Sequence, residues 1–291
     1  MTSPATSEDS VSLLRLRWLS ATAAVLIVGG LIAVAFVGGR EKTVDASLVV
    51  DAVKGTAQVA DSYSFESITE IAAGGSGASL HYEGAVDRAS DRSKIDYSVE
   101  GRDGPDLLIV AEGTRVYLAV PKEHRVRTGG KAWATADSAP AEVTQLIDAG
   151  RRDLSVFVAG ASSKATVVGS QELRGSATTH YRLRVSGDEM LNSLLTGPLG
   201  GAFPLDTFAG NVTIEVDPVD VWLDASRRLR RIDVVVRLSA GALSGEIRFS
   251  QELFDFGVAA TIDLPPPDQV ATLGSADELA VLTRSASELS N

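Results

Sequence analysis

The sequence of 291 residues contains no cysteine. This absence excludes disulfide bridges, thiolate metal ligands, a cysteine nucleophile and an N-terminal lipid-modified cysteine. Histidine is also scarce, with three residues, and we expect neither a metal nor a cofactor. The formal net charge of −11 disfavours nucleic acid as a partner, and it disfavours a basic docking face for anionic lipid headgroups.

Motifs for catalysis are missing as well: the chain has no G-x-S-x-G, no Walker A sequence and no H-E-x-x-H. His81 and His180 fall on the polar side of predicted strands, where an exposed histidine is ordinary. Asp217, Asp220 and Asp224 lack the glycine and the terminal glutamate of a calcium loop, and they flank a proline turn where aspartate is common. We therefore expect a protein that is not an enzyme.

Near the N-terminus, residues 18–39 carry no charge. As a helix this stretch would be roughly 33 Å long, enough to span a bilayer core of about 30 Å. Residues 1–17 are polar and end with two arginines, which predicts a cytoplasmic tail, a single-pass anchor in the cell membrane and an extracytoplasmic main domain. The alternative is a cleaved signal peptide, for which Ala33-Val34-Ala35 offers a cleavage site.

The rest of the chain divides into three parts. Residues 40–46 are expected to be a linker, 47–273 one folded domain, and 274–291 a polar C-terminal tail. The domain begins with an apolar stripe from Ser47 to about Ser62, which is typical of a helix, and Ser47 is a plausible N-cap.

Alternating apolar and polar residues dominate the domain. Because successive side chains of a strand point to opposite faces, each such segment predicts a strand with one apolar face. The alternation is cleanest from Asn211 to Asp255. Earlier segments, from Phe65 to Val120, follow one another through short turns, which predicts an antiparallel meander. Residues 107–110 are all apolar, so the pattern leaves open whether Leu107 and Ile109 or their neighbours face inward.

Few helices accompany these strands: short ones are expected at 141–149, after Asp153, and at Gly187–Leu195. The loop 197–210 combines glycine and proline with large apolar residues, so it either folds into the edge of the core or forms a lid over a pocket. About ten strands with so few helices expose more apolar surface than the helices can cover. The side chains that we predict to line an apolar cavity are Leu80, Tyr82, Ile95, Tyr97, Val116, Leu118, Ile147, Phe157, Leu183, Val185, Leu195, Phe203, Phe208, Ile214, Val234, Val236, Ile247 and Phe249.

Four local patterns occur in a characteristic order. They are Gly130-Lys131-Ala132-Trp133; Val168-Gly169-Ser170-Gln171-Glu172-Leu173-Arg174-Gly175 followed by Thr179-His180-Tyr181; Val221-Trp222-Leu223-Asp224 leading into Leu229-Arg230-Arg231-Ile232; and Phe256-Gly257 with Leu264-Pro265-Pro266-Pro267-Asp268-Gln269-Val270. Over about residues 47–270 the chain resembles the actinobacterial envelope lipoproteins of the LppX/LprG type, within the wider LolA-like fold. Their lipid-modified cysteine is absent here, and the uncharged N-terminal stretch stands in its place.

The resemblance implies an α+β fold, in which a curved antiparallel half-barrel sheet carries a few helices on its concave side and encloses a cavity for acyl chains. It also implies a non-catalytic protein that binds a lipid or an acylated glycolipid for transfer or chaperoning in the cell envelope. The alternative is a structural or sensor ectodomain that binds an envelope protein partner and has no ligand cavity.

Overall fold

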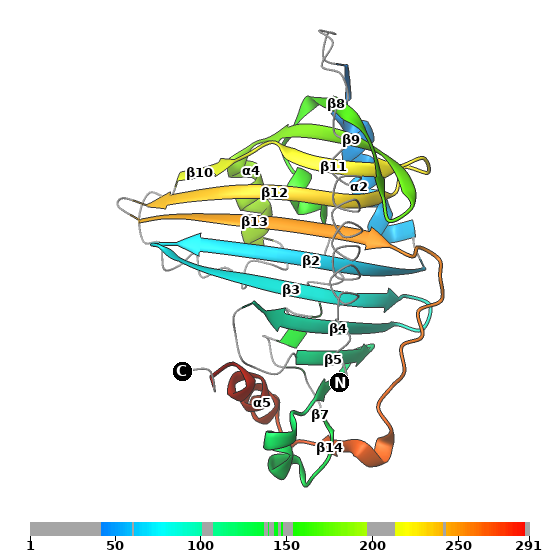
Figure 1. Cartoon of the computed structure of the whole chain (residues 1–291), viewed down its shortest axis with the longest axis vertical. Helices are drawn as coiled ribbons and strands as arrows, with labels where there is room; N and C mark the ends of the chain where they lie inside the picture. The colour runs from blue at the N-terminus through cyan, green and yellow to red at the C-terminus, as the bar shows by residue number, and fades with distance from the viewer. Residues whose placement is uncertain are drawn as a thin grey trace, which may run out of the picture. The chain divides into compact units, whose positions relative to one another are not determined.

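A computed structural model describes residues 42–59, 61–100, 107–136, 139, 143, 144, 147, 154–196, 213–240 and 243–288. Their strands join in a single sheet of fourteen strands, ordered β1-β8-β9-β11-β12-β13-β2-β3-β4-β5-β6-β7-β14, with β10 also paired to β12 (Figure 1). Every pairing is antiparallel except that of β7 with β14. The predicted antiparallel sheet is therefore confirmed, and it is larger than the ten strands expected.

The long strands are β2 (Ser62–Ala73), β3 (Ser76–Asp87), β4 (Arg92–Val99), β8 (Ala161–Leu173), β9 (Ser176–Val185), β12 (Leu229–Ala240) and β13 (Leu243–Phe254). The shorter ones are β1 (Thr43–Asp45), β5 (Leu107–Glu112), β6 (Arg115–Ala119), β7 (Trp133–Thr135), β10 (Thr213–Val216), β11 (Val219–Asp224) and β14 (Val270–Thr272). Strand β14 follows the triple proline at 265–267, a sequence that normally ends a sheet because proline cannot donate to a strand ladder. Its edge position and its parallel partner allow the chain to rejoin the sheet there.

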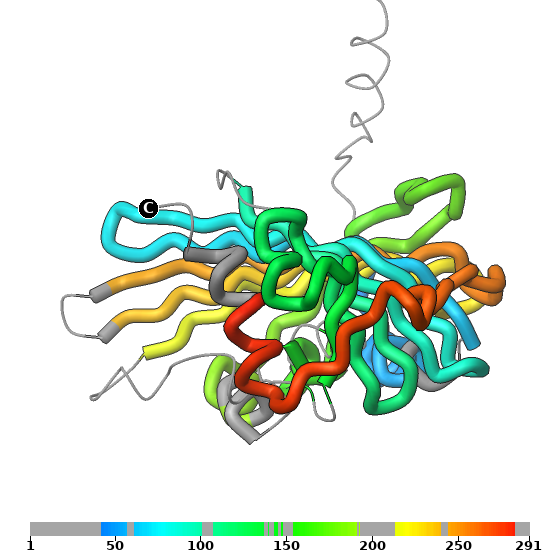
Figure 2. The backbone as a smooth tube through the Cα atoms, turned by 90° about the horizontal axis from the view of Figure 1, so that it is seen from below, coloured from blue at the N-terminus to red at the C-terminus, as the bar shows by residue number. Residues whose placement is uncertain are grey.

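The helices that the structure describes over their full length are α2 (Ala46–Val59), α4 (Gly187–Thr196) and α5 (Ala276–Glu288), with the 3-10 turns η1 (Lys122–Thr128), η2 (Leu154–Val158) and η4 (Pro267–Gln269). Both α2 and α4 lie behind the sheet in Figure 1, and Figure 2 shows them on the same side of it. We call this side the inner face and the opposite side the outer face.

The start of the domain differs from the sequence expectation. Residues 43–45, assigned to a linker, form β1 and pair with β8. The cap of α2 is Asp45 and not Ser47, because the Asp45 carboxylate accepts the backbone N–H of Ser47 at 2.9 Å. A carboxylate at this position also interacts favourably with the positive end of the helix dipole.

The C-terminal segment, expected to be a polar tail, forms α5. Leu279 and Leu282 of this helix are 0% and 2% exposed and belong to the main hydrophobic core. Ser275 accepts the backbone N–H of Glu278, whose carboxylate accepts the N–H of Gly274, an arrangement close to a capping box. Two buried leucines at i, i+3 spacing are enough to dock an otherwise polar helix.

Within the described part of the chain, no helix is both long and apolar enough to cross a membrane. The predicted anchor at 18–39 and the loop at 197–210 lie outside the described residues. Of the helix predicted at 141–149, Val143 and Ile147 are described, and both are helical and buried.

Register places the apolar phase of neighbouring strands on the inner face. Val234 of β12 pairs with Phe249 of β13, and Ile95 of β4 pairs with Ile109 of β5. This pairing decides the question left open at 107–110: Leu107 and Ile109 face inward. Val110 is nevertheless 3% exposed, because on the outer face it belongs to a second small cluster with Tyr117 and Ile262.

Close packing across the inner face depends on a glycine. A Cβ atom at Gly84 would lie 2.7 Å from the Phe65 ring and 2.3 Å from the backbone oxygen of Lys94. Phe65 is fully buried, so its ring cannot give way by turning into solvent. The absence of a side chain at Gly84 therefore allows Phe65 to cross the neighbouring strand.

We expect Gly84→Ala to lower the free energy of unfolding by about 1–3 kcal/mol, because the added methyl group overpacks the core. Gly169→Ala is the matched control, since a Cβ atom there meets nothing within 4 Å. Urea denaturation of both variants measures the difference. Equal stabilities would contradict the packing described here.

Candidate functional site

The inner face has one end that is thoroughly buried. Phe65, Ile232 and Leu253 lie toward this end of the sheet and are at most 7% exposed. Helix α2 covers part of it with Val49 and Val53, which are 0% and 1% exposed. This region is filled by the protein's own side chains.

Toward the opposite strand ends the same face is only half-buried. Leu80 and Tyr82 of β3, Val236 of β12 and Ile247 of β13 are partly exposed, and Ile71 of β2 is 37% exposed. All five lie on the inner side of their strands, as the cross-strand register shows. Apolar side chains thus reach solvent on the face that elsewhere forms the core.

The predicted cavity residues fall into three groups. Ile95, Val116, Leu118, Ile147, Phe157, Leu183, Val234 and Phe249 are buried in the hydrophobic core. Leu80, Tyr82, Tyr97, Val185, Ile214, Val236 and Ile247 are half-buried on the inner face. Phe203 and Phe208 lie outside the described residues, as does the side chain of Leu195. The half-buried group is the part available to a ligand, and the lining as a whole stays a prediction.

A depression of about 720 Å³ lies at these same strand ends. Its lining includes the glycine-rich turn at 74–77, Leu238, and the charged side chains of Arg237 and Glu246. The depression is open and mixed in polarity. It borders the half-buried apolar region with polar and backbone groups.

Sequence patterns overlooked a polar residue on the inner face. Gln251 of β13 is 1% exposed between the paired residues Ile232 and Ser67, and its Oε1 atom has no hydrogen-bond partner within the described chain. The Oγ atom of Ser93 on β4 is also buried and has no hydrogen-bond partner within the described chain. Gln251 interrupts the apolar phase of Phe249 and Leu253, and this break was the available signal.

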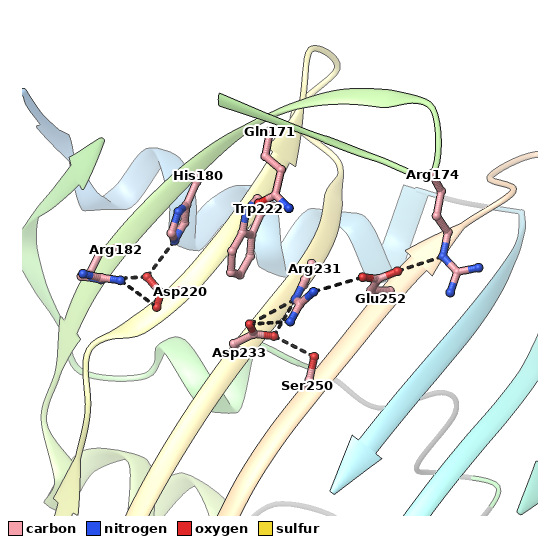
Figure 3. Close-up of polar contacts among 10 residues, drawn as sticks. All are labelled: Gln171, Arg174, His180, Arg182, Asp220, Trp222, Arg231, Asp233, Ser250 and Glu252. Atoms are coloured by element: carbon pink, nitrogen blue, oxygen red, sulfur yellow. Dashed lines mark hydrogen bonds and ion pairs between the residues drawn. The ribbon is translucent and has the colours of Figure 1, made fainter. Parts of the chain in front are cut away.

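Charged side chains cover the outer face of the central strands (Figure 3). Arg231 binds Asp233 on its own strand at 2.8 Å and reaches Glu252 on β13 at 3.3 Å. Glu252 in turn accepts from Arg174 at 2.8 Å. These pairs link β12 and β13 to the turn between β8 and β9.

His180 lies in this outer network and differs from the lone exposed histidine that we expected. Its side chain is 15% exposed, its Nε2 lies 2.8 Å from Asp220 Oδ1, and its ring stacks on Trp222 with centroids 4.1 Å apart. Arg182 donates to both oxygens of Asp220. Within the described residues, His180 and Arg182 therefore meet at one carboxylate, that of Asp220.

No group of three or more His, Asp or Glu residues in the described chain could hold a metal ion. Asp224, one of the three aspartates considered from the sequence, instead accepts from Arg228 and Arg230, each at 2.9 Å. Burial disfavours its charge, but the backbone N–H of Arg228 and these side-chain hydrogen bonds together outweigh that effect and lower the pKa of Asp224.

The Asp220 carboxyl provides a test of the outer network. Burial raises its pKa, but hydrogen bonds from His180 and Arg182 outweigh burial and leave the pKa below its usual value. A lowered folded-state pKa stabilises the fold above the unfolded-state pKa, and this contribution is lost as the pH falls through the folded-state value.

We expect Asp220→Asn to cost about 1–2 kcal/mol of unfolding free energy at pH 7, because charged hydrogen bonds are lost. The difference from the unaltered protein should shrink from about pH 4 downward. Urea denaturation across this pH range measures it. A difference that does not change with pH would show that the charge of Asp220 is unimportant.

No protein-family model and no curated protein sequence matches this chain. Among solved structures, the lipoprotein LppX of Mycobacterium tuberculosis is similar at 14% identity and a TM-score of 0.43, with 76% of this chain and 100% of LppX covered. LprF of Mycobacterium bovis is similar at 13% identity and a TM-score of 0.40, with 76% of this chain and 96% of LprF covered. A LolA superfamily protein of Nitrosomonas europaea is similar at 10% identity and a TM-score of 0.28, with 76% of this chain and 96% of that protein covered. Similarity at this level assigns neither family nor activity.

Proposed function

We propose that this protein binds the acyl chains of a lipid or acylated glycolipid on the inner face of its sheet and does not act as an enzyme. The observation that carries the proposal is the set of half-buried apolar side chains on that face, represented by Leu80, Val236 and Ile247. Water contact with such a surface is unfavourable, and an acyl chain would remove it at about 0.8 kcal/mol per buried methylene.

The polar groups that border the half-buried apolar side chains suit the polar head of such a ligand. The depression beside Leu238 is lined by Arg237, Glu246 and backbone groups of a glycine-rich turn. Apolar walls with a polar rim suit a molecule with an acyl chain and a polar head. Because apolar burial is not directional, the site should discriminate weakly between chain types.

The proposed function places the protein at a membrane surface. The uncharged stretch at 18–39 would anchor it there, with the sheet domain outside the cytoplasm. Such a tether limits the distance over which cargo moves, so the proposed role is local transfer or chaperoning of lipid in the cell envelope.

Filling the half-buried region tests the proposal. We expect Leu80→Trp to reduce the lipid retained in native mass spectrometry and to weaken binding of a fluorescent fatty acid. The loss should be about 2 kcal/mol, because the indole would displace two or three methylenes.

Ile68→Trp is the matched control for this experiment. Ile68 lies on the outer face of β2, is 38% exposed and should tolerate the indole without loss of lipid. Circular dichroism verifies that both variants fold. Full lipid retention by folded Leu80→Trp protein would overturn the proposed site.

Charge on the inner face gives a second test. Val236→Arg should reduce lipid retention or stability, because an unpaired charge would face apolar neighbours. Arg248→Ala, on the outer face of β13, should be almost silent in both measurements, since its ion pair with Glu246 is exposed. Equal effects of the two substitutions would contradict the assignment of the faces.

A further inference from the structure

The most exposed large apolar side chain in the described chain is that of Val126, which is 84% exposed. Val126 lies in the 3-10 turn η1, at the end of the sheet formed by β7 and β14 and far from β8 (Figure 1). A single exposed valine is ordinary by itself. Its charged neighbours make this one distinctive.

Residues 122–131 contain four cationic side chains, Lys122, Arg125, Arg127 and Lys131, against one carboxylate, that of Glu123. None of the four forms an ion pair within the described chain. Arg125 and Lys131 donate to main-chain carbonyls, so their charges are not neutralised by a carboxylate. The net charge of −11 for the whole chain conceals this local basic turn.

The turn is held in shape by its own hydrogen bonds. The N–H of Gly130 donates to the Arg125 carbonyl at 2.7 Å, and Arg125 Nε donates to the Val120 carbonyl at 3.1 Å. The hydroxyl of Thr128, a buried residue, lies 2.8 Å from the Lys131 carbonyl. Gly129 ends the turn with a positive φ of 62°. A preformed turn loses less conformational entropy when it binds a partner.

We propose that η1 docks onto the surface of an anionic lipid bilayer. Lys122 and Arg127, both exposed, would contact the lipid phosphates, and Val126 between them would enter the apolar margin of the headgroup layer. Such a layer offers negative charge and apolar surface together, and this turn presents the complementary pair. A nucleic-acid backbone would satisfy the cations but leave the valine in water.

This docking rests on η1 alone and is independent of any ligand on the inner face. If the inner face does carry acyl chains, the proposal adds the position at which the domain meets the membrane that supplies or receives them. The two proposals fail separately, because the variants that test them alter different segments.

The test uses the full chain in phosphatidylcholine nanodiscs, so that an N-terminal anchor is already occupied. Vesicles of phosphatidylcholine, alone or mixed with phosphatidylglycerol, are then added and binding is measured by biolayer interferometry. We expect binding to the phosphatidylglycerol vesicles, weakening with salt. The double variant Lys122→Gln and Arg127→Gln should bind roughly 25-fold more weakly, about fivefold per charge.

A valine pair separates the apolar contribution from the charge. Val126→Ser should weaken binding about fivefold, whereas Val258→Ser, at a valine that is 60% exposed on another segment, should leave it unchanged. Equal binding to both vesicle types, or full binding by the double variant, would overturn the proposal. So would binding of an RNA oligonucleotide that the double variant loses while vesicle binding persists.

Discussion

Cross-strand register is the constraint on which the rest of this structure depends. Because side chains alternate along a strand, the pairing of Val234 with Phe249 and of Ile95 with Ile109 brings the apolar phase of many strands onto one face. A shift of one residue between two strands would expose that phase on one of them. The hydrophobic core, the half-buried region and the charged outer face all follow from this single arrangement.

The two ends of the inner face carry the same apolar alternation but differ in how far it is covered. Helix α2 packs against β8, β11 and β12, and its buried valines belong to the same hydrophobic core as Phe65 and Leu253. Toward Leu80 and Ile247 the strands continue, but their apolar side chains stay half-buried. The outer face is tied together by charged pairs such as Arg231 with Glu252, which are partly exposed and so contribute modestly to stability. Packing holds the sheet together, and the uneven coverage supports the proposed ligand site.

Whole-chain properties and local properties disagree in this protein. The net charge argued against a basic docking face, yet four cations that form no ion pair within the described residues lie within ten residues around Val126. His180 is a second example, because it lies on the polar side of its strand as expected but is half-buried, pairing with Asp220 and stacking on Trp222. Neither the net charge of a chain nor the alternation along one strand shows which residues from other segments surround a side chain. Those neighbours determine its burial and its interactions.

The sequence alone determined the antiparallel sheet, the phase of strands such as the one containing Val236, and the helices α2 and α4, because these depend on local periodicity. Tertiary structure decided which of Leu107 and Val110 faces inward, and it buried both because a distant segment with Ile262 covers the outer side. It also turned the expected polar tail into α5, docked through Leu279. The capping pattern Ser275 to Glu278 was visible in the sequence, but only contact with the core makes so polar a helix stable.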